Sequence, residues 1–446
     1  MAMEFTPMRW PDQWKNPSAL SLLKGTSINC LLIEDESTLQ PVISEARRNG
    51  LRVMKAKSPP PGVTIVSGVW PGIRMSQSGH RDESSTGPTG APWVNSNGWK
   101  VRLAAALNPQ SAIWVDVTPE NPPRGSYTLC FSDAAAFGGR WIISLDEQFA
   151  RGIQARNREA LQSWQDLVRS ANFFAAHSSW SDYTGEAVVG VVSSFSGENE
   201  FLSHELLNLL TRTCEQYRII PKAKFSKAQV AGLRAVVYPD SDPPSADLRK
   251  QILDFVGDGG LLITGPQWGE TPGNPDQSGS TAWKACEEAR GGALGDTAGW
   301  NLPRYNCRAL SRGRIAIAKS DAADPYLLAN DTVAFVSHQY DLLRFWDVGA
   351  VNAYLSTAPD RKRAVAQMVF YVPEMVGRRR FGVPRTTTVR VAGQYRTAQL
   401  LTFDQSTRLP TLTSPISDKV GVKIQKDAVE LHLPRLSHYA AVELGA

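Results

Sequence analysis

The sequence lacks several features that would assign it to a specialised class. No apolar run approaches the roughly 20 residues of a membrane-spanning helix, and the N-terminal stretch MAMEFTPMRWPDQW contains no apolar signal-peptide core. Neither sign of charge dominates, because 48 basic and 43 acidic residues leave a net charge of +5. The few basic runs, RNREA, DRKRA and GRRRF, are typical of solvated surface. We therefore expect a soluble, cytoplasmic protein with no membrane and no nucleic-acid partner.

Cysteine and histidine are also scarce, with five and six residues. The odd number of cysteines, the lack of any Cys-x-x-Cys and the apolar runs around Cys30 and Cys130 indicate buried free thiols in a reducing compartment. No His, Cys or Lys recurs at the predicted strand ends described below, which argues against a metal site or a Schiff-base lysine. We therefore expect neither a metal nor a cofactor.

Residues 1–185 alternate strand and helix signals. Six apolar stretches predict strands: SINCLLI, LRVMKA, VTIV, AIWV, YTLCF and RWIISL. Nearly continuous apolar strands that alternate with helices are typical of a parallel sheet covered on both faces. A complete eight-stranded barrel usually needs about 200 residues or more. We therefore predict an α/β multidomain protein whose residues 1–185 form a TIM-like barrel that is trimmed or irregular.

The rest of the chain divides into two further regions. Between Ala187 and Gly265 the order is strand, helix, strand, strand, helix, strand, which predicts an open α/β sheet built from crossover units. Residues 270–310 are rich in Gly, Ser and Asp and predict a long loop. From about residue 311, short alternating stretches such as TVAFVS predict an antiparallel β-sandwich. The predicted domains are 1–185, 186–345 and 346–446.

Carboxylates follow several of the predicted barrel strands. Glu34 follows SINCLLI, Asp116 follows AIWV with Glu120 beyond a turn, and Asp133 follows YTLCFS. Active sites of parallel α/β barrels lie at the carboxyl ends of the strands, and glycoside hydrolysis requires two carboxyl groups. Capping of the next helix is the competing explanation for each carboxylate, above all for Asp133. The catalytic candidates are, in order of preference, Glu34 and Asp133, with Asp116 and Glu120 competing for the remaining role.

Tryptophan is abundant, with 13 residues, and several lie beside turns. Trp is often a core residue, but its flat ring also packs on the apolar face of a sugar, and Asn amides match vicinal hydroxyls. The segment GPTGAPWVNSNGW combines both residue types. An ordinary loop whose Asn97 caps the next helix is the alternative, and Asp146 lies beside a helix start. The candidate substrate-binding residues are Trp70, Trp93, Asn95, Asn97, Trp99 and Asp146.

The three-part order and the ending LHLPRLSHYAAVEL together resemble trimer-forming β-galactosidase-like glycoside hydrolases. In that family a barrel precedes a glutamine-amidotransferase-like, flavodoxin-type domain and a C-terminal β domain. The resemblance implies a hydrolase of β-galactosides or related small β-glycosides that takes a small carbohydrate substrate and assembles as a homo-oligomer, namely a trimer. It also implies a middle domain that packs between subunits.

Two family signatures are missing. No Asn-Glu pair follows a predicted barrel strand, because Asn199-Glu200 lies in the middle region. No Gly-x-Cys-x-Gly elbow occurs, so the middle domain is not expected to be catalytic. The alternative is a catalytically inactive relative that binds sugar or serves in assembly. The sequence leaves open the exact sugar, the stereochemical outcome and which carboxylate acts as the acid.

Overall fold

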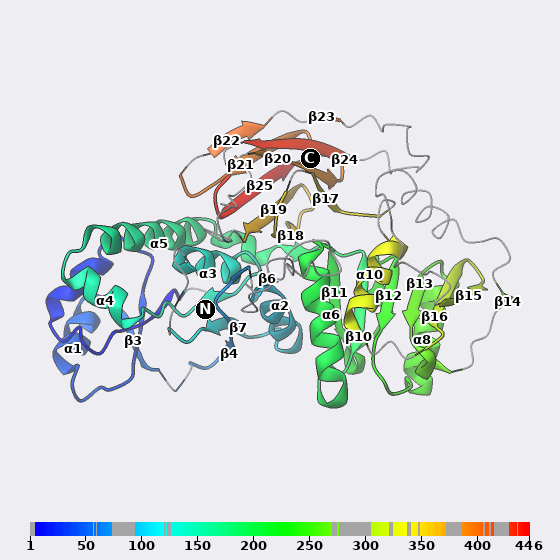
Figure 1. Ribbon diagram of the computed structural model, residues 1–446, viewed down its shortest axis with the longest axis horizontal. Helices are drawn as coiled ribbons and strands as arrows, with labels where there is room; N and C mark the ends of the chain where they lie inside the picture. The colour runs from blue at the N-terminus through cyan, green and yellow to red at the C-terminus, as the bar shows by residue number, and fades with distance from the viewer. Residues whose placement is uncertain are drawn as a thin grey trace, which may run out of the picture.

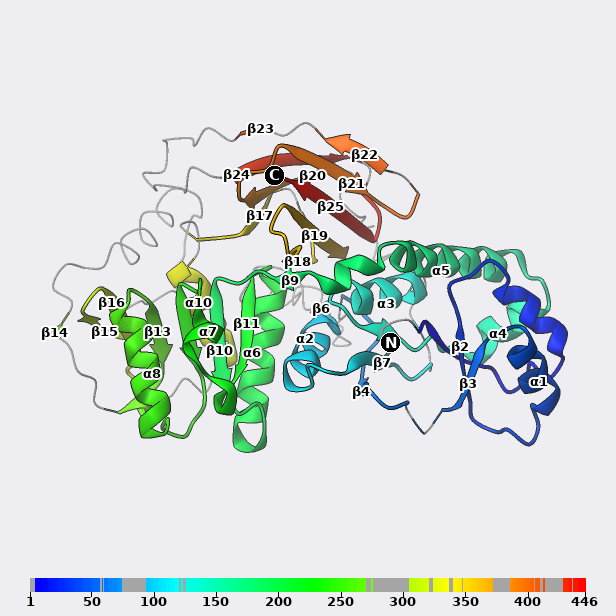
Figure 2. The same cartoon turned by 180° about the vertical axis from the view of Figure 1, so that it is seen from behind.

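A computed structural model shows three units (Figure 1). An N-terminal α/β unit and a middle α/β unit lie side by side, and a C-terminal β unit lies across both of them, as Figure 2 shows from behind. The structure describes residues 5–56, 58, 60–73, 94–119, 122, 126–269, 274–275, 305–320, 324–336, 340–346, 348–371, 386–404, 406–409, 412–413, 428–434 and 436–446.

Six short parallel strands form the sheet of the N-terminal unit. The strands are β1 (Pro7–Arg9), β2 (Cys30–Ile33), β3 (Arg52–Lys55), β4 (Val63–Ser67), β7 (Ala112–Asp116) and β8 (Arg140–Trp141). A parallel bridge between Met8 and Ile143 joins two groups of three, which gives the order β3-β2-β1-β8-β7-β4. Consecutive strands are neighbours, as in a barrel. In the described residues β3 and β4 do not pair, so no pairing closes the sheet at that seam.

Helices cover the outside of this sheet. They are α1 (Gln40–Arg48), α2 (Gly98–Leu107), α3 (Ser126–Ala135), α4 (Glu147–Gln154) and α5 (Arg158–Ala176), with the 3-10 turns η2 (Pro17–Leu23) and η3 (Ser178–Asp182). A two-stranded ribbon pairs β5 (Gly72–Ile73) with β6 (Val94–Asn95). Helix α5 lies on the side of the unit that faces the C-terminal β unit (Figure 1).

Two of the strands predicted from sequence are helices. YTLCFS belongs to α3, in which every residue from Ser126 to Ala135 except Thr128 is buried. TVAFVS belongs mainly to α10 (Pro325–Val336). Both predictions were wrong because a helix that is buried on nearly all sides shows no polar stripe, and its short apolar run then looks like a buried strand. Strand β1 was missed because it is only three residues long.

The middle unit contains a seven-stranded sheet in the order β11-β10-β12-β13-β16-β15-β14. Its parallel strands are β10 (Val189–Ser193), β11 (Tyr217–Pro221), β12 (Ala235–Tyr238), β13 (Leu261–Thr264) and β16 (Gly313–Ala318). The edge strands β15 (Tyr305–Leu310) and β14 (Asn274–Pro275) are antiparallel. The helical elements are η4 (Gly197–Asn199), α6 (Glu200–Arg212), η5 (Lys222–Lys224), α7 (Lys227–Val230), α8 (Ala246–Gly257), η6 (Pro266–Trp268) and α10.

The four strands and two longer helices predicted between Ala187 and Gly265 are present in the predicted order, and the structure adds the short helix α7 between β11 and β12. In chain order its five parallel strands are arranged 2-1-3-4-5, a doubly wound sheet whose topological switch point lies between β10 and β12. Most of the loop predicted for residues 270–310 lies outside the described residues, and its end, 305–310, is strand β15.

Two antiparallel sheets form the C-terminal β unit, in the orders β17-β20-β24-β23 and β22-β21-β25-β19-β18-β9. Their strands are β9 (Thr184–Gly185), β17 (Leu343–Trp346), β18 (Val351–Thr357), β19 (Arg363–Phe370), β20 (Thr386–Ala392), β21 (Thr397–Leu401), β22 (Ser406–Leu409), β23 (Leu412–Thr413), β24 (Ala428–Pro434) and β25 (Tyr439–Gly445). Residues of both sheets, such as Leu355 and Leu431, share one core. The predicted domain boundaries stay predictions, but β9 and β17 both belong to these sheets.

Candidate active site

A polar layer lies at the carboxyl ends of the N-terminal strands. Side chains alternate along a strand, so every second residue faces the same side. Cys30 and Leu32 pack with Trp114 and Ile142 in a small inner cluster, whereas Leu31 and Ile33 pack in the larger core that the helices share. The next residue on the inner face after Leu32 is Glu34. On β2, β7 and β8, the residues that face the inner cluster are therefore followed on the same face by a polar residue: Glu34, Asp116 and Ser144.

Arg9, at the end of β1, joins these polar residues. Its Nη1 donates to Asp116 Oδ1 at 3.1 Å and to Ser144 Oγ at 3.1 Å, and its Nη2 donates to Asp116 Oδ2 at 2.9 Å. Its Nε lies 3.3 Å from Glu34 Oε1, without the geometry of a hydrogen bond. Because one planar guanidinium contacts both carboxylates, Glu34 and Asp116 lie well within about 10 Å of each other. The site is open to solvent, since the side chains of Glu34 and Asp116 are 35% and 34% exposed.

Arg9 was missed by the sequence reasoning. The signal is the alternation in Met8-Arg9-Trp10, where Met8 and Trp10 are both buried and the residue between them faces the other side. Such an alternation over three residues is too short to predict a strand by itself. Ser144 was also missed, because in the sequence it lies within the apolar run RWIISL before Asp146.

An aromatic cluster lies beside the polar layer. Trp70 follows β4 in the turn that runs past Asp116, where the N–H of Gly68 donates to the backbone oxygen of Asp116 at 2.7 Å. The indole N–H of Trp70 donates to the oxygen of Thr118 at 2.9 Å. Its ring meets those of Tyr127 and Trp141 edge to face, with centroids 5.4 and 5.9 Å apart. The ring is therefore fixed in place, yet it is only partly buried.

Asp133 does not lie at a strand end, which corrects the sequence prediction. It is on helix α3, its side chain is fully buried, and all its contacts are structural. Oδ2 accepts from the backbone N–H and the side-chain amide of Asn97 at 2.6 and 2.9 Å, and Oδ1 accepts from the hydroxyl of Tyr371 in the C-terminal β unit. Burial raises its pKa to about 6, against the hydrogen bonds from Tyr371 and Asn97, which lower it.

Asn97 belongs to the same network and does not face a ligand site. Its side-chain oxygen accepts from the N–H of Val69 at 2.8 Å, and its amide donates to the oxygen of Val69 at 2.9 Å as well as to Asp133. Its position before α2 is that of a cap, but its side chain makes no capping hydrogen bond. Asn97 therefore fixes the turn that carries Trp70 to helix α3.

The other predicted substrate-binding residues are dispersed. Asn95 lies in the β5–β6 ribbon, and Trp99 packs against the core of the middle unit with its ring 5.4 Å from that of His204. Asp146 caps α4 by accepting from the N–H of Phe149 at 2.9 Å, and it also accepts from the hydroxyl of Tyr127. Two predicted residues lie outside the described residues: Trp93 and Glu120.

The switch point of the middle unit holds a second polar cluster. Asp240 is 1% exposed and accepts from the N–H of Ser194 at 3.0 Å and from the hydroxyl of Ser193, while the ammonium of Lys222 lies 2.6 Å away. Lys222 also lies 2.8 Å from Asp242. Lys222 thus pairs with both carboxylates, and buried polar groups are normally paired in this way. The role of the cluster is therefore to support the loops after β10 and β12.

Cys214 has no nucleophilic character in this unit. It lies just past α6, is buried, and burial raises the pKa of its thiol to about 12. Its Sγ donates to the oxygen of Val351 in the C-terminal β unit at 3.4 Å. His204 is on α6, where burial lowers its pKa. A thiol with a raised pKa is a packing residue and not an activated nucleophile.

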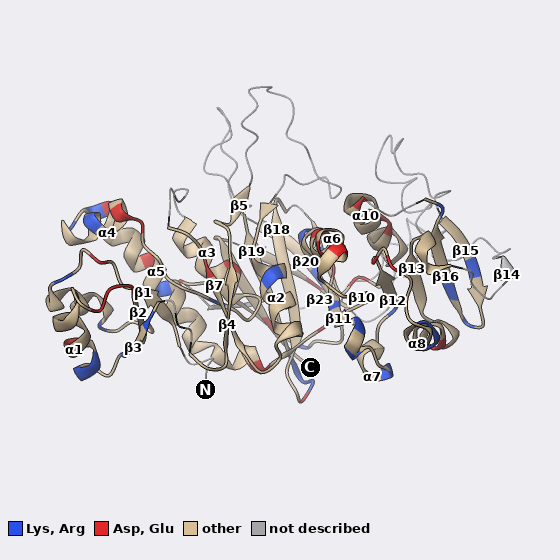
Figure 3. Cartoon of the chain, turned by 90° about the horizontal axis from the view of Figure 1, so that it is seen from below, with Lys and Arg blue, Asp and Glu red and all other residues tan. Residues whose placement is uncertain are grey.

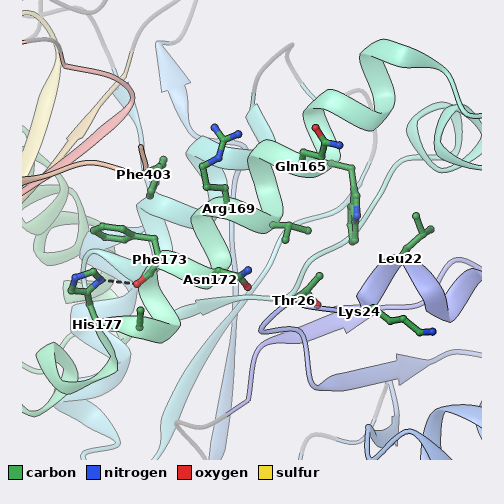
Figure 4. A pocket seen from close by; sticks show the side chains of 12 residues that line it. Leu22, Lys24, Thr26, Gln165, Arg169, Asn172, Phe173, His177 and Phe403 are labelled. Atoms are coloured by element: carbon green, nitrogen blue, oxygen red, sulfur yellow. Dashed lines mark hydrogen bonds between the residues drawn. The ribbon is translucent and has the colours of Figure 1, made fainter. Parts of the chain in front are cut away.

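A groove of about 610 Å³ runs along α5 (Figure 4). Three of its polar residues are already paired: Asn172 accepts from the N–H of Ser27 at 2.7 Å, Arg169 lies 2.8 Å from Asp404, and the Nδ1–H of His177 donates to the oxygen of Phe173 at 2.8 Å. None of the predicted site residues lines it. The groove is therefore the seam where η2, α5 and the C-terminal β unit meet.

Neither the distribution of charged residues nor any group of metal-ligating side chains among the described residues points to a further site. Basic and acidic residues are interspersed over the elements of both α/β units when the molecule is seen from below (Figure 3). Among the residues that the structure describes, no three His, Cys, Asp or Glu side chains are grouped to hold a metal ion. Within the same residues, no helix has both the length and the apolar character needed to cross a membrane.

The comparisons with known proteins find likeness in fold only. No protein-family model and no curated protein sequence matches the chain. An α-L-fucosidase isoenzyme 2 from Paenibacillus thiaminolyticus superimposes with a TM-score of 0.51 at 10% identity, over 95% of this chain and 78% of that one. A β-galactosidase from Bacillus circulans sp. alkalophilus gives a TM-score of 0.47 at 11% identity, over 92% of this chain and 67% of that one. A structure described as Gan42B, a GH42 β-galactosidase, gives a TM-score of 0.48 at 10% identity, over 86% of this chain and 60% of that one.

These values define what the likeness shows. The α/β multidomain fold of this chain is similar to that of the fucosidase structure, and the chain spans about three quarters of that protein's length. At 10% identity the likeness carries no residue of the site with it.

Proposed function

We propose that the chain is a glycoside hydrolase of small β-glycosides, with β-galactosides as the first substrates to test, and that Glu34 and Asp116 are its carboxyl pair. The observation that carries the proposal is the contact of Arg9 with both carboxylates at the carboxyl edge of a parallel, barrel-like sheet. The fold likeness to a protein described as an α-L-fucosidase supports the general class of reaction.

The geometry supports a division of labour between the two carboxylates. Both oxygens of Asp116 are held by Arg9, which Ser144 holds in turn, so Asp116 is the more rigidly oriented group. Glu34 contacts only Nε and is freer to meet a ligand. In glycoside hydrolysis one carboxyl protonates the leaving oxygen, and the other attacks the sugar or activates a water. The partly buried ring of Trp70 at the same edge supplies an apolar surface for the sugar ring.

A sugar-binding or assembly protein without turnover is the second candidate. It is favoured by the bidentate pair between Arg9 and Asp116, because such a pair is stable and must open before Asp116 can act on a ligand. The lack of pairing between β3 and β4 in the described residues also favours it, since a sheet that does not close leaves one side of the site without a wall. A homotrimer, which light scattering would test, fits either candidate.

The deciding experiment is a panel of nitrophenyl glycosides that includes β-D-galactoside, β-D-glucoside and α-L-fucoside. We expect the wild type to cleave at least one of them, and Glu34→Gln and Asp116→Asn to lower kcat by about 10²–10⁴-fold with little change in melting temperature. Glu45→Gln is the matched control, since Glu45 lies on α1 and pairs with the exposed Arg48.

Two further measurements distinguish the roles and the alternatives. The first is rescue of turnover by added azide. In a retaining enzyme, a glycosyl azide product of inverted configuration shows that the rescued variant lacks the nucleophile, and a product of retained configuration shows that it lacks the acid/base group. If no glycoside is cleaved but galactose binds in calorimetry, and Trp70→Ala abolishes the binding, the sugar-binding function replaces the proposal. Turnover that survives in both carboxylate variants excludes this site.

A further inference from the structure

A cavity of about 440 Å³ lies at the amino ends of β7 and β8, away from the polar layer. Its walls are formed by the starts of β7 and β8, by the turn η3 after α5, and by strands β18 and β19 of the C-terminal β unit. The volume is that of a site for a small molecule, since such sites range from about 300 to 1,000 Å³.

The feature that distinguishes this cavity is the guanidinium of Arg140. Arg140 lines the cavity and is 8% exposed. Among the described residues its side chain makes one hydrogen bond, which Nη1 donates to the backbone oxygen of its neighbour Gly139 at 2.9 Å. Within the described part of the chain no carboxylate lies within ion-pair distance of it. Buried charges are normally paired, because an ion that loses water without gaining a partner is costly.

The surroundings of Arg140 are consistent with a missing anion. Burial lowers its pKa, and no acidic neighbour opposes that shift. The one acidic residue of the cavity wall, Asp182, is exposed and makes no ion pair with Arg140. Arg140 is the one Lys or Arg side chain among the described residues that line this cavity.

The rest of the wall suits an organic anion better than a bare ion. Trp180, Tyr183 and Tyr354 offer ring surface, and Ser178, Ser181 and Gln110 offer hydroxyl and amide groups. A guanidinium fork matches the two oxygens of a carboxylate or a phosphate, and aromatic rings match the apolar face of a small body attached to it.

We propose that this cavity binds a small organic oxyanion, a carboxylate or phosphate attached to a compact polar body, with Arg140 as its counter-charge. The site is independent of the proposed glycosidase site, since it lies at the opposite end of the strands. Its occupation ties β7 and β8 to η3 and the C-terminal β unit, so binding raises the stability of the whole molecule.

The test is thermal unfolding of the full chain with sodium glucuronate, sodium phosphate or glucose at constant ionic strength set with sodium chloride. We expect a saturable rise in melting temperature with glucuronate or phosphate and none with glucose. A rise with glucuronate alone assigns a sugar acid, and a rise with phosphate alone assigns a phosphate. Arg140→Gln should weaken the apparent affinity more than tenfold, and Arg140→Lys less. The control Arg151→Gln, on an exposed arginine of α4, should leave it unchanged.

Hydrogen–deuterium exchange on the wild type decides the matter even if Arg140→Gln does not fold. The active anion should slow exchange in peptides that cover residues 138–142 and 177–183 and leave peptides that cover Arg9 and Glu34 unchanged. The proposal is overturned if neither anion gives a saturable rise, if the rise persists in Arg140→Gln, or if the protected peptides lie elsewhere.

Discussion

The buried contact between Asp133 and Tyr371 gives the sharpest test of the structure. Asp133 is fully buried on α3, and Tyr371, which is 1% exposed, donates its hydroxyl hydrogen to it from the C-terminal β unit. The same hydroxyl accepts from the amide of Asn352 at 3.1 Å. The change Tyr371→Phe removes only the hydroxyl, so it deletes a donor to a buried carboxylate and an acceptor for Asn352 without opening a cavity.

A matched control is present in the same unit. Tyr439 is also fully buried, and its hydroxyl donates to the neutral amide of Gln367 at 2.8 Å. Hydrogen bonds to charged groups contribute about 1.5–3 kcal/mol, and neutral ones about 1 kcal/mol. We therefore expect Tyr371→Phe to lower the free energy of unfolding by about 2–3 kcal/mol at pH 8, and Tyr439→Phe by about 1 kcal/mol.

The pH dependence separates the two variants further. The pKa of Asp133 is raised from its ordinary 3.8 to about 6, so the folded protein binds a proton there that the unfolded chain releases. Stability from this group is therefore highest at low pH and falls as pH rises from about 4 to about 6, by about 3 kcal/mol in all. Removing the hydroxyl of Tyr371 raises this pKa further. The loss in Tyr371→Phe should grow as pH rises through 6, while that in Tyr439→Phe stays flat.

The measurement is differential scanning calorimetry of the wild type and both variants at pH 5 and pH 8. Comparing two Tyr→Phe changes in one unit avoids assuming that a three-unit protein unfolds in a single step. Equal losses for Tyr371→Phe at both pH values, or a loss no greater than that of Tyr439→Phe, would refute the reasoning. Asp133 would then be neutral at pH 8 or not bound to Tyr371.

Three other predictions follow from single contacts. Gly313→Ala should cost at least about 1–3 kcal/mol, since a Cβ there would lie 2.0 Å from the backbone oxygen of Val256, while Gly349→Ala, with nothing within 4 Å, should leave the melting temperature unchanged. Asp146→Ala should lose about 1 kcal/mol of stability with no change in KM, and Asp146→Asn less, because the role of Asp146 is to cap α4; a change in KM alone would instead place it at the substrate. Arg9→Lys should cost about 1 kcal/mol at low salt and less in 1 M NaCl, because one ammonium cannot hold Asp116 with two nitrogens; a loss that salt does not alter would contradict this.

The part of the site that could be predicted is the part that depends on local pattern. Glu34 and Asp116 both end inner rows of apolar residues on parallel strands, and the carboxyl ends of such strands share one edge. That reasoning needs no knowledge of which strands are neighbours. It failed for Asp133 because the run before it is a helix, and nothing in a short apolar run separates a buried helix from a buried strand.

The rest of the site depends on contacts between distant residues. Asp133 meets Asn97 and Tyr371, which are 36 and 238 positions away in the chain. Arg9 meets Asp116 across 107 positions. A single sequence carries no sign of such partners, because each residue taken alone also suits a solvated surface. The satisfied network around Asn97 in particular could not be told from a sugar-binding amide, since both require the same donor and acceptor.

Gly68 shows how a local requirement and a distant one combine at this edge. A Cβ on Gly68 would lie 2.5 Å from Val115 Cγ1 and 2.7 Å from Val117 Cγ2, so only a glycine lets the chain leave β4 against the flank of β7. The close approach allows the N–H of Gly68 to bond the backbone oxygen of Asp116, and Asn97 then holds both backbone groups of Val69. The turn thus delivers Trp70 to the edge where Asp116 ends its strand. The glycine in VTIVSG predicts a turn from sequence, but the reason for it, the side chains of Val115 and Val117 that lie 47 and 49 positions later, exists only in the fold.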